Sequence, residues 1–310
     1  DLIRREKVSL VHARSRAPAF SALWAAHATK TPFVATYHGV YNARSNLKRW
    51  YNAVMTKGDL VIANSEYTRL HVIQEHGIPP EKAIPRGVDL SRFEPGMVGC
   101  DRAKGLAQAW GVAPDERRLK VLLAGRLTRW KGQGLMIEAM TLLKARGEDR
   151  ILLLLAGDDQ GRKGYRAELT DAIAAAGLED RVKLVGHCDD MPAAYLLADL
   201  AIAPSLEPEA FGRTAVEPQV MGRPVMAADH GATRETVVPG ETGWLVKPGD
   251  AEAWANALLE AAEAGASRRQ AMGQAARARA RRLYSVDAMC EATLDVYARV
   301  LRARGMEHAS

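Results

Sequence analysis

Two carboxylates separated by seven residues frame the stretch with the clearest chemical pattern, Glu209-Ala-Phe-Gly-Arg-Thr-Ala-Val-Glu217. It follows an apolar run at 200–203, and its Phe-Gly turn predicts a helix just beyond, with Glu217 in the first turns. A helix N-terminus and free backbone amides stabilise an anion. We therefore expect a crevice for a diphosphate flanked by polyhydroxylated rings, the shape of a nucleotide sugar. Its donors are the amides of Phe211, Gly212, Arg213 and Thr214.

The two glutamates have different predicted partners. Glu217 is placed to accept ribose hydroxyls, and Glu209 to hydrogen-bond the sugar. Glu207 remains an alternative to Glu209, because Glu207-Pro-Glu209 offers two carboxylates at this point. A plain strand-to-helix loop with ordinary acidic residues at the helix start is the simpler explanation for both.

A second candidate is the loop Ala124-Gly-Arg-Leu-Thr-Arg-Trp-Lys-Gly132. Gly125 permits a tight exit from the preceding strand, and Arg126 and Lys131 place two cations five positions apart. Parallel sheets bind ligands at the carboxyl ends of their strands. Arg126 and Lys131 are thus predicted to neutralise a diphosphate without a metal ion. Surface charges on a loop are the alternative.

A third candidate is Thr36-Tyr-His-Gly39, also a strand end followed by glycine. His38 is a catalytic candidate if it faces a cleft between two domains, and a structural histidine otherwise. The stretch Ala83-Ile-Pro-Arg-Gly-Val-Asp89 is interpreted as a strand end and turn that approach a linker.

Short β-rich runs alternate with helical stretches along the chain, which predicts parallel α/β layers. Two series are separated by a polar, linker-like segment at 93–115. The expected strands are 8–11, 33–36, 60–63 and 82–84 in the first series, and 119–124, 151–156, 182–185, 200–203, 225–228 and 244–246 in the second. The predicted domains are residues 1–100, joined by a last helix at 284–304, and residues 116–283.

Composition limits the class of protein. Residues 1–100 hold 14 Lys and Arg against 8 Asp and Glu, whereas the remainder has 29 of each, so the net charge of +6 lies in the first part. This asymmetry indicates either an acidic surface as a partner or a solvated surface without a binding role. Three scattered cysteines, no long apolar run and a charged start favour a cytoplasmic protein.

Metal and nucleic-acid functions lack support in the sequence. It has no Asp-x-Asp motif, no His/Cys cluster with ligand spacing and no phosphate-binding P-loop. The basic part has no nucleic-acid-binding motif. We therefore expect no metal, no other cofactor and no nucleic-acid partner.

Taken in order, these motifs resemble the retaining glycosyltransferase family 4. The resemblance rests on Glu-x7-Glu with Phe-Gly inside, Gly-Arg…Lys-Gly, Ile-Pro-x-Gly-Val-Asp and Gly231-Ala-Thr-Arg-Glu235, over nearly the whole chain. It implies a GT-B fold, two Rossmann-like domains facing across a cleft. Family members usually begin with further strands and a glycine-rich loop, so we expect the first domain to be incomplete here.

The resemblance also assigns roles to residues. Arg126 and Lys131 would hold the diphosphate of a nucleotide-sugar donor, Glu217 the ribose and Glu209 the sugar. His38 would lie near the reacting sugar, and the loop at Gly186-His187 would border the base. The implied reaction retains configuration, with attack of the acceptor hydroxyl on the same face and the leaving phosphate as base.

The favoured function is a retaining transfer of a sugar from a UDP-sugar to a glycan or lipid-linked acceptor. The pathway would be cell-envelope, exopolysaccharide or lipopolysaccharide synthesis. Alternatives are a GDP-mannose-dependent mannosyltransferase, a related synthase or phosphorylase, and a fragment that binds nucleotide sugar without turnover.

Two helices bear on the acceptor. Residues 42–57 combine cations with Leu47, Trp50, Tyr51 and Val54 at helical spacing. Such a helix either contacts an anionic membrane peripherally or packs Trp50 into its own domain. The last helix carries an apolar stripe that includes Leu294 and Tyr297, and we expect it to pack on the first domain.

Overall fold

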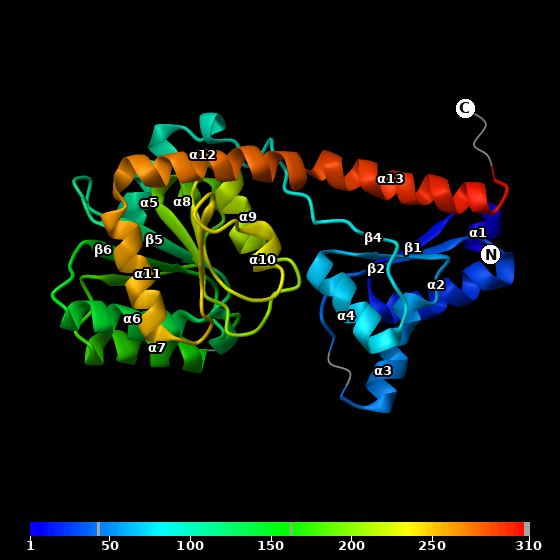
Figure 1. The fold of residues 1–310 in the computed structure, drawn as a ribbon, viewed down its shortest axis with the longest axis horizontal. Coiled ribbons are helices and arrows are strands. Elements are labelled where there is room, and N and C mark those ends of the chain that lie inside the picture. The colour runs from blue at the N-terminus through cyan, green and yellow to red at the C-terminus, as the bar shows by residue number, and fades with distance from the viewer. Residues whose placement is uncertain (42–43, 162, 307–310) are drawn as a thin grey trace. The chain divides into compact units, whose positions relative to one another are not determined.

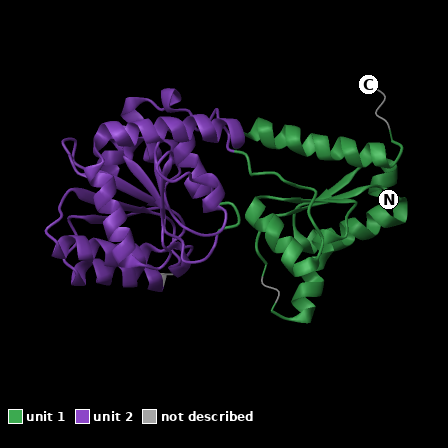
Figure 2. Ribbon diagram, in the orientation of Figure 1, with its two compact units in different colours: residues 1–87, 209–211, 284–310 green, residues 88–208, 212–283 purple. Residues whose placement is uncertain are grey.

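The computed structural model describes residues 1–41, 44–161 and 163–306, and the chain divides into two compact units (Figures 1 and 2). Unit 1 consists of 1–87, 209–211 and 284–310, and unit 2 of 88–208 and 212–283. Within the described ranges each unit is built on one parallel sheet, of four strands in unit 1 and six in unit 2. The α/β class and the two Rossmann-like domains expected from the sequence are confirmed.

Unit 1 orders its strands as β1-β2-β3-β4. Their bounds are β1 Val11–Ala13, β2 Phe33–Tyr37, β3 Leu60–Ala63 and β4 Lys82–Ala83. The helices are α1 Leu2–Arg5, α2 Arg16–Thr29, α3 Asn46–Ala53, α4 Glu66–His76 and α13 Val286–Ala303, with a 3-10 turn at Val54–Thr56.

The strand expected at 8–11 was wrong by three residues. The Val8 amide donates to the Ile3 carbonyl at 3.0 Å, so it completes the end of α1 instead of joining a strand. Pairing begins at Val11, whose amide donates to Pro32 at 2.9 Å. The apolar residues Val8 and Leu10 led to the wrong prediction. Residues just after a helix can pack their side chains against the protein as strand residues do.

Alternation along β2 sends side chains to opposite faces of the first sheet. Phe33, Ala35 and Tyr37 join a core with α2 and α4, and Val34 joins Ile62, Ile84, Val296 and Val300 on the other face. The last helix, α13, therefore packs on the sheet of unit 1 (Figure 1).

The contact face of α13 differs in part from the predicted stripe. Val296 and Val300 are buried, and Met289, Ala292 and Tyr297 pack beside them. Leu294 is 61% exposed. The predicted stripe was therefore wrong in part, because it included Leu294 and omitted Val296 and Val300, which lie against the sheet.

Unit 2 orders its strands as β10-β9-β8-β5-β6-β7. Their bounds are β5 Leu119–Ala124, β6 Ile151–Ala156, β7 Val182–Gly186, β8 Leu200–Ala203, β9 Val225–Ala228 and β10 Gly243–Val246. All six residues of β6 are buried, as expected of a central strand covered on both faces. The chain starts in the middle of the sheet at β5, builds outward on one side, then crosses to β8 on the other.

The helices of unit 2 cover both faces of its sheet (Figure 1). They are α5 Cys100–Ala109, α6 Gln133–Ala145, α7 Lys163–Ala175, α8 Met191–Leu197, α9 Arg213–Val220, α10 Thr233–Thr236, α11 Ala251–Glu263 and α12 Gly265–Leu283. Within the described parts of the chain, no helix is both long and apolar enough to span a bilayer.

The segment at 93–115, expected to be a linker, instead belongs to unit 2 and contains α5. Arg102 on α5 donates two hydrogen bonds to the Asp190 carboxylate, at 2.9 and 2.7 Å. The chain changes units at Gly87–Val88, earlier than the composition indicates. A short, polar helix fixed by such contacts has little apolar periodicity to reveal it.

Candidate functional site

The strand order of unit 2 reverses between β5 and β8, and ligands of open α/β sheets bind outside the strand ends at such a point. The loops after these two strands meet there. The Leu206 amide donates to the Trp130 carbonyl at 2.7 Å. Gly132 has φ 82°, and a Cβ there would clash with the Pro204 carbonyl oxygen. Only glycine tolerates both this positive φ and the close approach of the Pro204 carbonyl, so Gly132 allows the two loops to touch.

The loop after β5 carries Gly125, Arg126 and Lys131. The buried Gln133 amide donates to the Arg126 carbonyl at 2.9 Å and fixes the loop backbone. The stem of Lys131 lies over Gly125, 3.6 Å from where a Cβ would stand, and its ammonium lies 4.3 Å from the Trp130 ring centroid. Two predicted cations thus lie on one fixed loop at the end of a central strand.

Helix α9 presents Glu217 as a buried carboxylate. Glu217 pairs with Arg213 at 2.6 Å and accepts from the buried Tyr195 hydroxyl at 3.2 Å. Burial raises the pKa of Glu217, and the Arg213 guanidinium opposes that rise. The ion pair supplies the compensation that a buried charge needs. Pro218 lies inside α9, which begins at Arg213 directly after Gly212.

Arg92 and Tyr195 were missed by the sequence reasoning. The Arg92 guanidinium donates to the Asp189 carbonyl at 3.2 Å, and its charge, like that of Arg213, opposes the rise that burial causes in the pKa of Glu217. Nearby, the His187 ring pairs with the Asp189 carboxylate at 2.9 Å and is mostly exposed. Arg92 lies three residues after the end of the Ile-Pro-x-Gly-Val-Asp stretch, which was the available signal.

Residues 209–211 group with unit 1, although Gly212 and α9 belong to unit 2. The Ser65 hydroxyl donates to the Ala210 carbonyl at 2.5 Å, and Phe211 packs edge-on against Tyr284. Glu209 is half-buried and Glu207 exposed. The two predicted carboxylates, Glu209 and Glu217, therefore start from different units.

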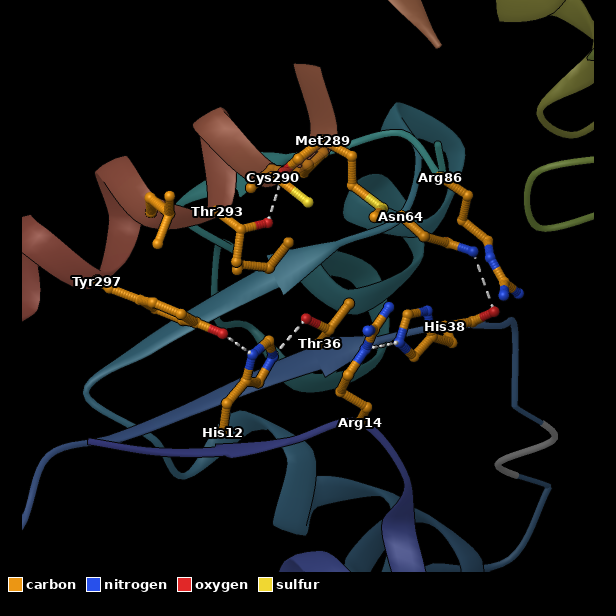
Figure 3. A pocket seen from close by; sticks show the side chains of 13 residues that line it. His12, Arg14, Thr36, His38, Asn64, Arg86, Met289, Cys290, Thr293 and Tyr297 are labelled. Carbon is orange, nitrogen blue, oxygen red and sulfur yellow. Dashed lines mark hydrogen bonds between the residues drawn. The ribbon is translucent and has the colours of Figure 1, made fainter. Parts of the chain in front are cut away.

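His38 lies in a pocket of about 450 Å³ in unit 1, at the carboxyl ends of its strands (Figure 3). A polar side chain follows each strand: Arg14 after β1, His38 after β2, Asn64 after β3 and Arg86 shortly after β4. Residues of α13 line the opposite side. We call this cavity the strand-end pocket.

Two half-buried histidines are held neutral in this pocket. Arg14 donates to His38 Nε2 at 3.4 Å, and Asn64 donates to the His38 carbonyl at 3.1 Å. Burial, followed by the Arg14 charge, lowers the pKa of His38 to about 4. His12 has its pKa lowered to about 4 by the same two causes, and its ring bridges Tyr297 and Thr36 at 2.5 and 2.7 Å.

Within residues 1–41, 44–161 and 163–306, no three His, Cys, Asp or Glu side chains form a group that could hold a metal ion. The side chains and backbone amides at these strand ends can accept and donate hydrogen bonds and stabilise charge.

Comparison with known proteins places the fold and the strand-end loops in a family. Residues 107–279 match the family described as Glycosyl transferases group 1, and residues 1–92 match Glycosyltransferase Family 4. The chain belongs to the group 1 glycosyltransferases, which confirms the resemblance drawn from the motifs.

Individual relatives agree with the family. The D-inositol 3-phosphate glycosyltransferase of Salinispora tropica is 32% identical over 252 residues, which are 79% of this chain and 52% of that protein. The chain spans about half the length of the curated relatives it matches.

Solved structures confirm the GT-B fold. A glycosyltransferase from Rickettsia africae superposes with a TM-score of 0.88 at 31% identity, covering 97% of this chain and 79% of its own. Anabaena HepE in complex with UDP and glucose superposes with a TM-score of 0.83 at 26% identity, covering 94% and 78%.

Proposed function

We propose that this chain transfers a sugar from a nucleoside-diphosphate sugar, with UDP-sugars as donors, to a glycan or lipid-linked acceptor. The observation that carries the proposal is the meeting of two loops at the strand reversal of unit 2. As a result, Arg126 and Lys131 lie at the same edge of the sheet as the N-terminus of α9, the helix that carries Glu217. UDP is favoured over GDP because HepE, which shares the fold, was solved with UDP.

In this proposal Arg126, Lys131 and the amides of Phe211 to Thr214 bind the diphosphate, Glu217 the ribose and Glu209 the sugar. Departure of the nucleoside diphosphate builds negative charge, and preorganised cations and amides stabilise it. They do so without a metal or other cofactor. No side-chain nucleophile is assigned. By resemblance to the retaining family, the acceptor hydroxyl attacks on the face that the nucleoside diphosphate leaves and passes its proton to the leaving phosphate, with His38 near the reacting sugar.

We also propose that unit 1 contacts an anionic membrane surface, where a lipid-linked acceptor of envelope synthesis would lie. Its support is an exposed apolar patch, which we define as Trp24, Leu47 and Trp50, at 83%, 72% and 62% exposure. Trp50 touches Phe20 of its own unit, at 5.5 Å between rings, yet remains mostly in solvent. Lys48 and Lys57 supply cations in the same segment. Residues 42 and 43 of the predicted helix lie outside the described residues.

A chain that binds nucleotide sugar without transferring it is the second candidate. It is favoured by one observation, that the chain spans about half the length of its curated relatives. This alternative would be supported if the chain binds a nucleotide sugar but forms no glycosylated product with any acceptor preparation that is added.

The donor proposal is tested by calorimetry with UDP, GDP and ADP, each with and without EDTA. We expect UDP to bind equally in both conditions. Lys131→Ala should weaken UDP binding by about 1.5–3 kcal/mol, the range for a hydrogen bond to a charged group. Lys144→Ala is the matched control, since Lys144 is bonded to carbonyls of residues 176 and 177 at the far end of α6. Loss of UDP binding in EDTA, or equal losses in both variants, would contradict the proposal.

A further inference from the structure

Residues 209–211 group with unit 1, whereas the residues on both sides of them belong to unit 2 (Figure 2). Helix α4 of unit 1 supplies two hydroxyl groups to this short segment. Ser65 donates to the Ala210 carbonyl at 2.5 Å, and Thr68 donates to the same oxygen at 3.3 Å. These bonds join positions that are 145 and 142 residues apart in the sequence, so no local turn or helix requires them.

The N-cap of α4 accounts for only part of the hydrogen bonding at Ser65. The Ser65 oxygen accepts from the Thr68 amide at 3.0 Å, which is the usual role of a serine at a helix start. That contact uses a lone pair and leaves the hydroxyl proton. Ser65 and Thr68 are 1% and 0% exposed, so their protons need acceptors inside the protein. The Thr68 oxygen is within reach of Ser65 at 3.1 Å, but the Ala210 carbonyl is closer.

The Ala210 carbonyl is well suited to hold this segment in one conformation. A carbonyl oxygen has two lone pairs, and this one accepts from two hydroxyls. On the far side of that peptide Phe211 is 4% exposed and packs edge-on against Tyr284, with 5.7 Å between the ring centroids. Both residues that follow Glu209 are therefore fixed within unit 1, and the planar peptides between them leave the Glu209 backbone little freedom.

The other end of the stretch is held by different contacts. Gly212 has φ 76°, in the left-handed region that glycine adopts without strain, and α9 begins directly after it. Glu217 on α9 is held by Arg213 and Tyr195, which like Glu217 belong to unit 2. The residue proposed to contact the sugar and the residue proposed to contact the ribose thus have separate supports.

We propose that Ser65 and Thr68 are positioning residues for recognition of the donor sugar, because their hydroxyls hold the Ala210 carbonyl and so fix Glu209 before the sugar binds. This rests on the proposed function in one respect, the assignment of Glu209 to the sugar. A contact residue that is fixed in advance loses less conformational entropy on binding. Removal of the hydroxyls should therefore weaken binding of the nucleotide sugar and spare binding of the nucleotide.

Calorimetry with UDP and UDP-glucose separates these two effects. Thr68→Val removes one hydroxyl at similar shape and keeps the backbone amide on which the N-cap of α4 depends. Ser65→Ala removes the other hydroxyl together with the cap, whereas Ser65→Thr keeps both. Ser45→Ala is the matched control, since Ser45 caps α3 in the same unit by accepting from the Lys48 amide at 3.2 Å.

We expect Ser65→Ala to weaken UDP-glucose about two- to tenfold, the range for one neutral hydrogen bond, and to leave UDP affinity unchanged. Thr68→Val should act in the same direction but less, because its bond is longer. Ser65→Thr and Ser45→Ala should bind both ligands like the unaltered protein. In a Glu209→Ala background, Ser65→Ala should cause no further loss, because one residue acts through the other.

Hydrogen exchange of the amides of residues 209–211, followed by mass spectrometry without ligand, reports on the segment itself. Exchange should be faster in Ser65→Ala than in the unaltered protein and unchanged in Ser45→Ala, since only the first variant loosens the segment. Unchanged exchange in Ser65→Ala would overturn the proposal.

Three affinity results would also overturn it: equal losses of UDP and UDP-glucose in Ser65→Ala, an equal loss of UDP-glucose in Ser45→Ala, or a loss that adds to that of Glu209→Ala. Impaired UDP-glucose binding in Glu209→Ala beside normal binding in Ser65→Ala would overturn the positioning role alone and leave the proposed function standing. Normal UDP-glucose binding in Glu209→Ala would contradict the proposed function of Glu209, and the positioning role would fall with it.

Discussion

In the proposed donor site, Glu217 should serve nucleotide recognition and Glu209 sugar recognition. Glu217 lies on α9, buried against Arg213 and Tyr195, whereas Glu209 lies before the Phe-Gly turn and groups with unit 1. Glu217→Gln should weaken UDP and UDP-glucose equally, by about 1.5–3 kcal/mol for a lost charged acceptor. Glu209→Ala should weaken UDP-glucose alone. Calorimetry with both ligands decides, and equal losses in the Glu209 variant would return Glu207 to consideration.

His12 makes the stability of unit 1 depend on pH. Its pKa is about 4 when folded and about 6.5 when unfolded, so the unfolded chain binds the proton first as pH falls. Stability should therefore decline as pH falls from about 6.5 to about 4, by about 1–3 kcal/mol once partial exposure is allowed for.

Hydrogen exchange of β2 amides measures that decline in unit 1. The His12→Gln variant keeps hydrogen-bonding groups for Tyr297 and Thr36 but does not titrate. Its loss of stability between about pH 6.5 and about pH 4 should therefore be smaller by the contribution of His12. The same slope in both proteins would show that His12 is not the group responsible.

Several residues of the candidate site could be identified from the sequence, but the contacts between them could not. Arg126, Lys131 and His38 were predicted because each follows an apolar run that ends in a parallel strand. Arg92, Tyr195, Arg14 and Arg86 were not, because their importance arises only when distant segments meet. Tyr195, for example, reaches Glu217 across 22 residues of chain.

At the scale of elements, α13 gives a direct test of packing. Val300 is 2% exposed among Val34, Ile62 and Ile84, whereas Leu294 on the same helix is 61% exposed. Val300→Ala should destabilise unit 1 by about 1–3 kcal/mol, from lost burial and the cavity left behind. Leu294→Ala should change it by less than about 0.5 kcal/mol. Urea unfolding measures both, and a larger loss for Leu294 would mean that another face of α13 is buried.

The bounds of strands and helices were easier to predict from the sequence where the element is more deeply buried. The strands Leu119–Ala124 and Ile151–Ala156 were predicted to the residue, because a parallel strand covered on both faces is mostly apolar, broken here only by Lys120. The helix α5 was taken for a linker, since its contacts are polar and its partner Asp190 lies 88 positions away. The burial of α13 was foreseeable, but its exact face depends on the surface of the first sheet.

At the scale of the whole molecule, charge and exposed apolar surface coincide in unit 1. The excess of +6 lies in residues 1–100, which also hold Trp24, Leu47 and Trp50. Exposed aromatic side chains enter the interface of a bilayer, and nearby cations are drawn to anionic lipid at about 1 kcal/mol each. The two features reinforce each other only at a surface that is both apolar and negative.

The protein should therefore sediment with vesicles that contain phosphatidylglycerol and stay in solution with vesicles of phosphatidylcholine alone. Trp24→Ala/Trp50→Ala should reduce sedimentation and leave UDP affinity unchanged. Met97→Ala, which removes a 72% exposed apolar side chain from unit 2, is the matched control and should have no effect. Added salt should also release the protein, because the cationic share is screened over about 8–10 Å at physiological ionic strength. Equal sedimentation with both kinds of vesicle, or the same loss in all variants, would contradict a membrane-facing role for this patch.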